Sequence, residues 1–196
     1  MFNLQKRVQG EDEDQKYLGS RISIRDKLLA QEMTELKTSL ADVKDCKLRF
    51  PNSSALHEME LTITPNSGLY VGGTFKFTIN VPPEYNNAPP TVKCLTRVWH
   101  PNINEEGNIC LSILRQNSLD GYGWLPTRKI MDVVLGLNAL FTDLIDFDDP
   151  LNVTAAEEYS KNKEAFGSKV RSYIQMYCKK ESSTVSDQAS KKVGRR

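Results

Sequence analysis

The stretch GGTFKFTINV at residues 72–81 sets the fold class of this chain. After the glycine pair, apolar residues stand at every second position, which is the pattern of a β-strand with one face in a core. The stretch LHEMELTI at 56–63 alternates in the same way, a shorter run follows at 92–95, and residues 46–50 can add an edge strand. Because the connections between these runs are short, they favour a four-stranded antiparallel meander.

Apolar residues at helical spacing flank the predicted sheet in the sequence. Upstream, Ser23 to Asp26 matches a capping box that opens an amphipathic helix. Downstream, a broad apolar face predicts a central helix from about Thr127, and one or two further helices are expected from about Thr154 to Cys178. The order of elements predicts an α+β fold. The apolar residues of the three helical regions are Leu29, Met33, Leu36 and Leu40, then Ile130, Val133, Val134, Leu137, Leu140, Phe141 and Leu144, then Phe166, Val170, Tyr173, Ile174 and Tyr177.

The length of 196 residues fits one globular domain at 23–178, of about 150 residues, with a polar segment at each end. Residues 1–22 show no apolar periodicity and are expected to form a flexible arm. The arm begins with apolar Met1, Phe2 and Leu4, as a docking peptide would, although an idle disordered tail fits the composition equally well. Residues 179–196 carry six basic and two acidic side chains and are expected to be a disordered basic tail.

The charge balance argues against two classes of main partner, although local charged patches remain open. Lys and Arg number 26 and Asp and Glu 25, a formal net charge of +1, whereas a nucleic-acid or anionic membrane surface favours a strongly basic protein. No stretch approaches the roughly 20 apolar residues of a membrane span, and the first residues lack the apolar region of a secretory signal. We therefore expect no nucleic acid and no membrane as partner, and a cytoplasmic and nuclear location.

The four cysteines, Cys46, Cys94, Cys110 and Cys178, favour neither a metal site nor a disulfide framework. They form no Cys-x-x-Cys pair, and only two histidines are present, so no metal and no cofactor are expected. Cys94 in a strand and Cys178 at a helix end are typical of small core residues, whereas Cys46 is uninformative. Cys110 differs because it lies in a long irregular segment at 99–124, where function is expected.

The motifs HPNI at 100–103 and GNICL at 107–111 place this cysteine eight positions after Asn102. The combination resembles the signature of ubiquitin-conjugating enzymes, and the likeness covers about residues 23–178. It implies an N-terminal helix, a four-stranded antiparallel sheet, an active-site loop and three further helices, which agrees with the periodicity. The other landmarks are PNSGLYVGGTFKF at 65–77, PPEY at 82–85 with PP at 89–90, WLPT at 124–127 and DPLN at 149–152.

Within that family the chain resembles the branch that conjugates a Nedd-type ubiquitin-like protein to cullins. The points of likeness are PTVKCLT at 90–96, CLSILR at 110–115, GLNALF at 136–141 and PLN at 150–152 with AAE at 155–157. YNNAPP at 85–90 and the insertion at 118–123 look like the less abundant, F-type form of that branch. Ser112 stands where many ubiquitin-specific members carry Asp, but SUMO-conjugating enzymes also carry Ser there.

The resemblance implies that Cys110 accepts the modifier as a thioester and passes it to a substrate lysine. Asn102 would stabilise the oxyanion or brace the loop. His100 would lock the loop, because it lacks a partner for proton transfer. Asp149 would orient or desolvate the incoming lysine, although an acidic turn before proline is also common, and Ser112 would support the site or simply cap the loop. Since amide formation from a thioester runs downhill, ATP is consumed upstream.

Partner contacts are also implied by the resemblance. The heterodimeric activating enzyme would meet the first helix and the apolar N-terminal peptide, a RING-type cullin ligase would meet two loops, and the donor modifier would meet the central helix. A co-ligase pocket is an alternative site for the acetylated N-terminal peptide, and core burial is the alternative for Leu135. The residues are Met1, Phe2, Leu4, Arg25 and Lys27 for the activating enzyme, Leu125, Pro126 and Asn87 for the ligase, and Leu135 for the modifier.

Three alternative functions remain open from the sequence. A conjugating enzyme for SUMO or ubiquitin would use the same residues. A noncatalytic binding module of the same fold would lack the cysteine that this chain has at 110. A thiol-redox protein would need a resolving cysteine near Cys110, and the sequence offers none nearby.

Overall fold

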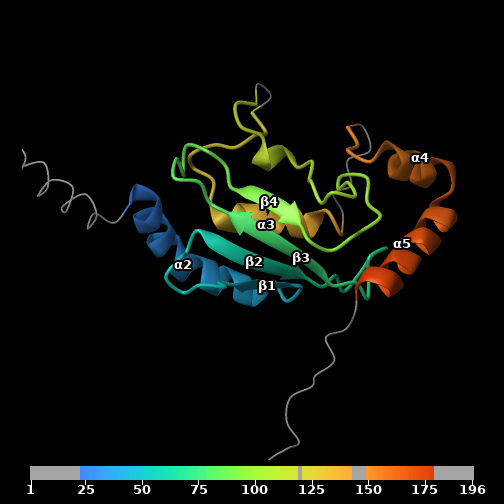
Figure 1. Cartoon of the computed structure of the whole chain (residues 1–196), viewed down its shortest axis with the longest axis horizontal. Helices are drawn as coiled ribbons and strands as arrows, with labels where there is room; N and C mark the ends of the chain where they lie inside the picture. The colour runs from blue at the N-terminus through green and yellow to red at the C-terminus, as the bar shows by residue number, and fades with distance from the viewer. Residues whose placement is uncertain (1–22, 119–120, 143–148, 179–196) are drawn as a thin grey trace, which may run out of the picture.

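A four-stranded antiparallel sheet forms the middle of the molecule, with helix α3 (Ile130–Ala139) behind it in Figure 1. In this computed structural model, residues 23–118, 121–142 and 149–178 are described. The strands β1 (Cys46–Arg49), β2 (Glu58–Ile63), β3 (Phe75–Asn80) and β4 (Thr91–Cys94) pair in chain order. The predicted α+β fold with a four-stranded meander is therefore confirmed, including its edge strand.

The alternation in the sequence places one face of the sheet in the core. In β3, Phe75, Phe77 and Ile79 are fully buried, while Lys76 and Asn80 on the opposite face are exposed. The register pairs Leu61 of β2 with Phe77, and Ile63 with Phe75, so apolar side chains line up across the sheet. The fully buried residues of α3 cover this face, and they are Ile130, Val133, Val134 and Leu137.

Helix α2 (Ile24–Asp42) lies at one end of the sheet, and α4 (Val153–Lys161) and α5 (Lys163–Tyr177) lie at the other (Figure 1). Ser23 is the N-cap of α2 as predicted, since its hydroxyl accepts from the backbone N–H of Asp26 at 3.0 Å. The region after 152 contains two helices because the Asn162 side chain caps a new one by accepting from Glu164 and Ala165.

Helix α3 begins at Ile130, three residues later than the sequence predicts from Thr127. The residues before it form a separate turn, in which the Arg128 N–H donates to the Leu125 carbonyl. The Asp132 carboxylate then accepts from the Lys129 N–H at 2.8 Å and fixes the start of the helix. The predicted arm at 1–22, the tail at 179–196 and Leu144 lie outside the described residues.

Candidate functional site

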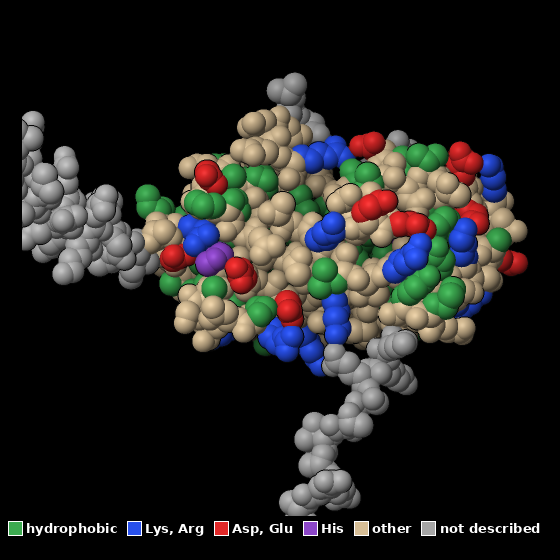
Figure 2. All heavy atoms as spheres, in the orientation of Figure 1, with side chains coloured by type: hydrophobic (Ala, Val, Ile, Leu, Met, Phe, Trp, Pro, Cys, Tyr) green, Lys and Arg blue, Asp and Glu red, His purple; other side chains and the backbone are tan. Residues whose placement is uncertain are grey.

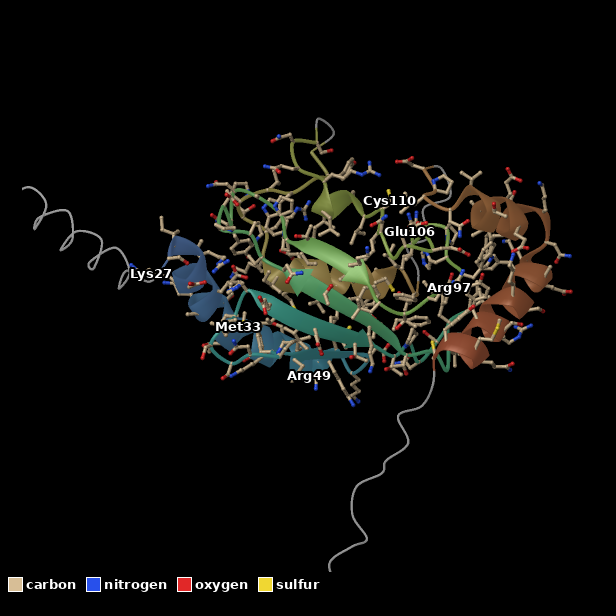
Figure 3. The ribbon with its side chains drawn as sticks, in the orientation of Figure 1. Lys27, Met33, Arg49, Arg97, Glu106 and Cys110 are labelled. Atoms are coloured by element: carbon tan, nitrogen blue, oxygen red, sulfur yellow. The ribbon has the colours of Figure 1, made fainter. Side chains whose placement is uncertain are left out.

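The chain from β4 to α3 carries Cys110 on a loop that is fastened to the sheet. The Gly107 carbonyl accepts from the Cys94 N–H of β4 at 2.9 Å. Gly107 has φ +80, and a Cβ added there would lie 2.1 Å from the Cys94 carbonyl oxygen, so only glycine fits. The loop then doubles back, and the Cys110 N–H donates to the Asn102 carbonyl at 2.8 Å. Cys110 is half-buried, and in Figure 3 it lies between η1 (Ser112–Leu114) and α4.

His100 is the buried support of this loop. Its Nδ1 accepts from the Asn102 N–H at 2.9 Å, so its Nε2 carries the proton and donates to the Leu140 carbonyl at 2.7 Å. The ring stacks on Tyr70 at 5.2 Å and meets the edge of Phe141. Burial lowers the pKa of His100 to about 4, although the hydrogen bond to Leu140 acts in the opposite direction. At neutral pH the imidazole is uncharged and both of its nitrogens are hydrogen-bonded, so it holds the turn and is not placed to act as a base.

Asn102 joins His100 to the nucleophile through its backbone. Its N–H donates to His100, its carbonyl accepts from Cys110, and its side chain is fully buried. It therefore supports the loop through its backbone, and its predicted role at the oxyanion stays a prediction.

Arg115, which sequence reasoning missed as a functional residue, connects the predicted nucleophile Cys110 to Asp149, the residue predicted to orient the acceptor lysine. Its Nη2 donates to the Cys110 sulfur at 3.0 Å and also to the Asp149 Oδ2 at 2.9 Å. The hydrogen bond to Cys110 and the charge of that sulfur, followed by the charge of Asp149, raise the pKa of the Arg115 guanidinium. Ser112 is exposed at the start of η1, and its backbone carbonyl accepts from the Arg115 N–H.

The other three cysteines are less suited to act as nucleophiles. Cys46 and Cys94 are buried in the core, and burial raises the pKa of Cys46 to about 11 and that of Cys94 to about 12. Burial also raises the pKa of Cys178. Thiolate formation is therefore disfavoured at these sites. Among the described residues, no group of three or more His, Cys, Asp or Glu is arranged to hold a metal ion.

The predicted ligase-binding residues lie on two loops that are joined to each other. Leu125 and Pro126 are exposed, and Asn87 is exposed on the facing loop. Asn86 connects the loops, because its Nδ2 donates to the Pro126 carbonyl at 2.6 Å and its carbonyl accepts from Trp124 Nε1 at 2.8 Å. Asn86 was not singled out from the sequence, since its partners lie about 40 residues away.

The remaining predicted contact residues differ in their exposure. Leu135 is 43% exposed on α3, so burial in the core does not explain why an apolar residue stands at this position. Lys27 is exposed on α2. Arg25 is largely covered, because its guanidinium donates to the Val81 carbonyl and to Asp26. Met1, Phe2 and Leu4 lie outside the described residues.

Acidic and basic side chains are interspersed over the face that Figure 2 shows. Among the helices of the described segments, none combines the length and the apolar character that crossing a bilayer demands.

The chain is similar to known proteins over most of its length. A family model described as ubiquitin-conjugating enzyme matches residues 28–174. The NEDD8-conjugating enzyme ubc-12 of Caenorhabditis elegans is 62% identical over 180 residues, which cover 91% of this chain and 100% of that protein. The NEDD8-conjugating enzyme UBE2F of Homo sapiens is 55% identical over 159 residues, 81% of this chain and 85% of that protein. Among solved structures, the E2 domain of a Toxoplasma gondii ubiquitin conjugating enzyme matches with a TM-score of 0.61 and 28% identity, over 76% of this chain and 99% of that one.

Proposed function

This chain belongs to the ubiquitin-conjugating enzyme family, and from that premise we propose that it conjugates a Nedd-type ubiquitin-like protein to a cullin. Cys110 accepts the modifier from the heterodimeric activating enzyme as a thioester and yields it to a cullin lysine with a RING-type ligase and co-ligase. The relatives that are more than half identical carry the NEDD8-conjugating name, which supports the choice of modifier. The vertebrate relatives carry the F-type name and the C. elegans relative does not, so the F-type branch is part of the proposal.

The observation that carries the proposal is the placement of the Cys110 sulfur. It lies half-buried on a loop held by the sheet and accepts a hydrogen bond from the Arg115 guanidinium, which also donates to Asp149. By contrast, Cys46 and Cys94 are buried, and burial raises the pKa of each thiol. A partner protein can reach Cys110 without unfolding the core.

The first step needs proximity more than acid–base catalysis. Transfer of an acyl group from one thiolate to another is nearly isoenergetic, so bringing the two sulfurs together supplies most of the rate. His100 is not needed as a base, which fits its burial and its two occupied nitrogens.

In the second step, three residues are candidates to act on the acceptor lysine. The Asp149 carboxylate is exposed beside the sulfur and is suited to orient or desolvate the amine. Asn102 supports the loop through its backbone hydrogen bonds to His100 and Cys110, and we propose that its side-chain amide stabilises charge on the thioester oxygen once the lysine attacks. Ser112 is exposed two residues after Cys110 and is a further candidate for contact with donor or acceptor.

The partner surfaces of the proposal lie on different elements. Lys27 offers an exposed charge on α2 to the activating enzyme, and the N-terminal peptide is proposed as a second contact. Arg25 supports the same surface, because its guanidinium donates to the Val81 carbonyl. The exposed Leu125 and Pro126 form the surface proposed for the ligase, and the exposed Leu135 is proposed to contact the donor modifier.

A charging assay tests the modifier. The full chain is mixed with ATP and, in parallel, with the activating enzymes and modifiers of the Nedd, SUMO and ubiquitin classes, and the products are separated with and without thiol reductant. We expect a reductant-labile adduct with the Nedd-type modifier, and a reductant-resistant cullin product once ligase and cullin are added. An adduct with SUMO or ubiquitin alone would show that the chain carries that modifier and not the Nedd-type protein. The absence of an adduct with any modifier would indicate the noncatalytic binding module.

The N-terminal peptide is tested separately. The double variant Phe2→Ala with Leu4→Ala is expected to charge more slowly while its melting temperature stays unchanged, because the peptide acts only in docking. Val8→Ala serves as a control for loss of an apolar side chain elsewhere in the same segment. Charging rates equal to wild type in the double variant would remove the docking role.

A further inference from the structure

The mechanism so far leaves one close contact unexplained, between the Arg115 guanidinium and the nucleophile. A single nitrogen, Nη2, donates to the Cys110 sulfur at 3.0 Å and to the Asp149 carboxylate at 2.9 Å. A guanidinium nitrogen of this kind carries two hydrogens, so both bonds can form at once. The Arg115 side chain is 42% exposed and that of Asp149 is 73% exposed, so burial in the core does not account for their pairing.

We propose that Arg115 is a catalytic residue of the transfer step, in which its Nη2 stabilises the Cys110 sulfur as the leaving thiolate while Asp149 holds the guanidinium over that sulfur. This inference rests on the proposed thioester at Cys110.

The chemistry of the step shows why a cation at this place changes the rate. The lysine nitrogen forms a bond to the thioester carbon and gives one proton to water or buffer, and the carbon–sulfur bond then breaks with its electron pair remaining on sulfur. In the thioester the sulfur is neutral and accepts hydrogen bonds poorly, whereas the departing thiolate accepts a strong, charge-assisted one. The contact with Arg115 is therefore stronger in the transition state than in the ground state, which is the condition for acceleration.

Charging has the opposite charge flow. There the Cys110 thiolate is the attacking group and loses negative charge as the new bond forms, so a cation beside it does not favour the transition state over the starting thiolate. Arg115 should consequently matter more for discharge than for charging.

Asp149 has a second function in this arrangement. Its carboxylate accepts from the same Nη2 that donates to the sulfur, and the pair also connects the loop before α4 to the residue that follows η1, 34 positions away in the sequence. Asp149 thus acts on the acceptor amine directly and on the leaving group through Arg115.

The test compares single-turnover discharge of the purified thioester to two small acceptors. Free lysine requires its amine to be oriented and deprotonated, whereas hydroxylamine is already uncharged at neutral pH and needs no such help. Arg115→Ala, Arg115→Lys and Asp149→Asn are compared with wild type. Arg97→Ala is the matched control, because Arg97 is also an exposed arginine paired with an exposed carboxylate, Glu105, at 2.9 Å, away from the sulfur.

We expect Arg115→Ala to slow discharge to both acceptors by a similar factor of about ten, the size expected for loss of a hydrogen bond to a charged group. Arg115→Lys should recover part of the rate, Arg97→Ala should resemble wild type, and charging should fall less than discharge. Loss with lysine alone, or unchanged discharge in a variant with the wild-type melting temperature, would overturn the inference.

The same experiment separates this inference from the proposed function. Charging of the wild-type chain reports on the modifier, and if only SUMO or ubiquitin is accepted, the discharge comparison is made with that thioester. If no thioester forms at Cys110 at all, the role of Arg115 is refuted together with the thioester.

Discussion

His100 makes the stability of the active-site loop depend on pH, and the direction follows from its contacts. A proton on Nδ1 would face the Asn102 N–H, which is a donor, and would place a charge among Tyr70 and Phe141. Burial accordingly lowers the pKa of His100 from 6.5 to about 4. The unfolded chain thus binds a proton below about pH 6.5 while the folded chain stays neutral until about pH 4. His100 stabilises the folded state above pH 6.5, and that stability is lost as the pH falls toward 4.

The size of the loss follows from the gap between the two pKa values of His100. One pKa unit corresponds to about 1.36 kcal/mol, so at pH 4 the folded state should be about 3 kcal/mol less stable from this residue alone, relative to pH 7.5. Carboxyl groups also titrate in this range, so the His100 contribution must be isolated.

Urea denaturation at pH 7.5 and pH 4 of the wild type and of His100→Asn isolates it. The variant has no titrating ring, so the wild type should lose about 3 kcal/mol more than the variant between the two pH values. NMR titration of the imidazole gives the pKa directly, with His57→Gln used to assign the signals. Equal losses in wild type and variant, or a His100 pKa near 6.5 in the folded chain, would refute the reasoning.

Three further predictions concern the loop and the partner surfaces. Gly72 and Gly107 both have φ in the left-handed region, but an added Cβ meets nothing within 4 Å at Gly72 and the backbone of β4 at Gly107. Gly72→Ala should cost about 1 kcal/mol and Gly107→Ala at least about 2 kcal/mol more by urea denaturation, and equal costs would contradict the clash. Asn86→Ala should slow ligase-stimulated transfer while charging without ligase stays unchanged, and equal loss in both assays would exclude a local role in the ligase surface. Leu135→Ala should change stability by less than about 1 kcal/mol, because the residue is 43% exposed and lies outside the buried core, and should slow discharge of the thioester; an unchanged discharge rate would remove it from the donor contact.

Local patterns in the sequence predict the helices and strands of the molecule well. Strict alternation fixes which face of β3 is buried, and Ser23 fixes the start of α2, because both depend on neighbours within a few residues. The start of α3 was predicted too early, since the turn at Arg128 and the cap from Asp132 follow from backbone geometry that apolar spacing does not record.

The site is harder to predict because its contacts join distant residues. Arg115 meets Asp149 across 34 positions, and Asn86 meets Pro126 across 40. Neither contact has a local signal in the sequence, although an arginine five positions after a candidate nucleophile was available as a clue. For His100 the sequence does give a local reason, because a single imidazole beside a proline lacks a partner for proton transfer, and in the structure both ring nitrogens are occupied by backbone groups.

The identity of the covalent carrier is tested most directly by exchanging the sulfur of Cys110 for oxygen. Cys110→Ser and the wild type are charged with ATP, activating enzyme and Nedd-type modifier, and each adduct is treated with thiol reductant and mapped by mass spectrometry. The wild type should give an adduct that the reductant removes, and the variant an oxygen ester at the same position that survives it. A reductant-labile adduct that persists in the variant, or one mapped to Cys46, Cys94 or Cys178, would contradict the account.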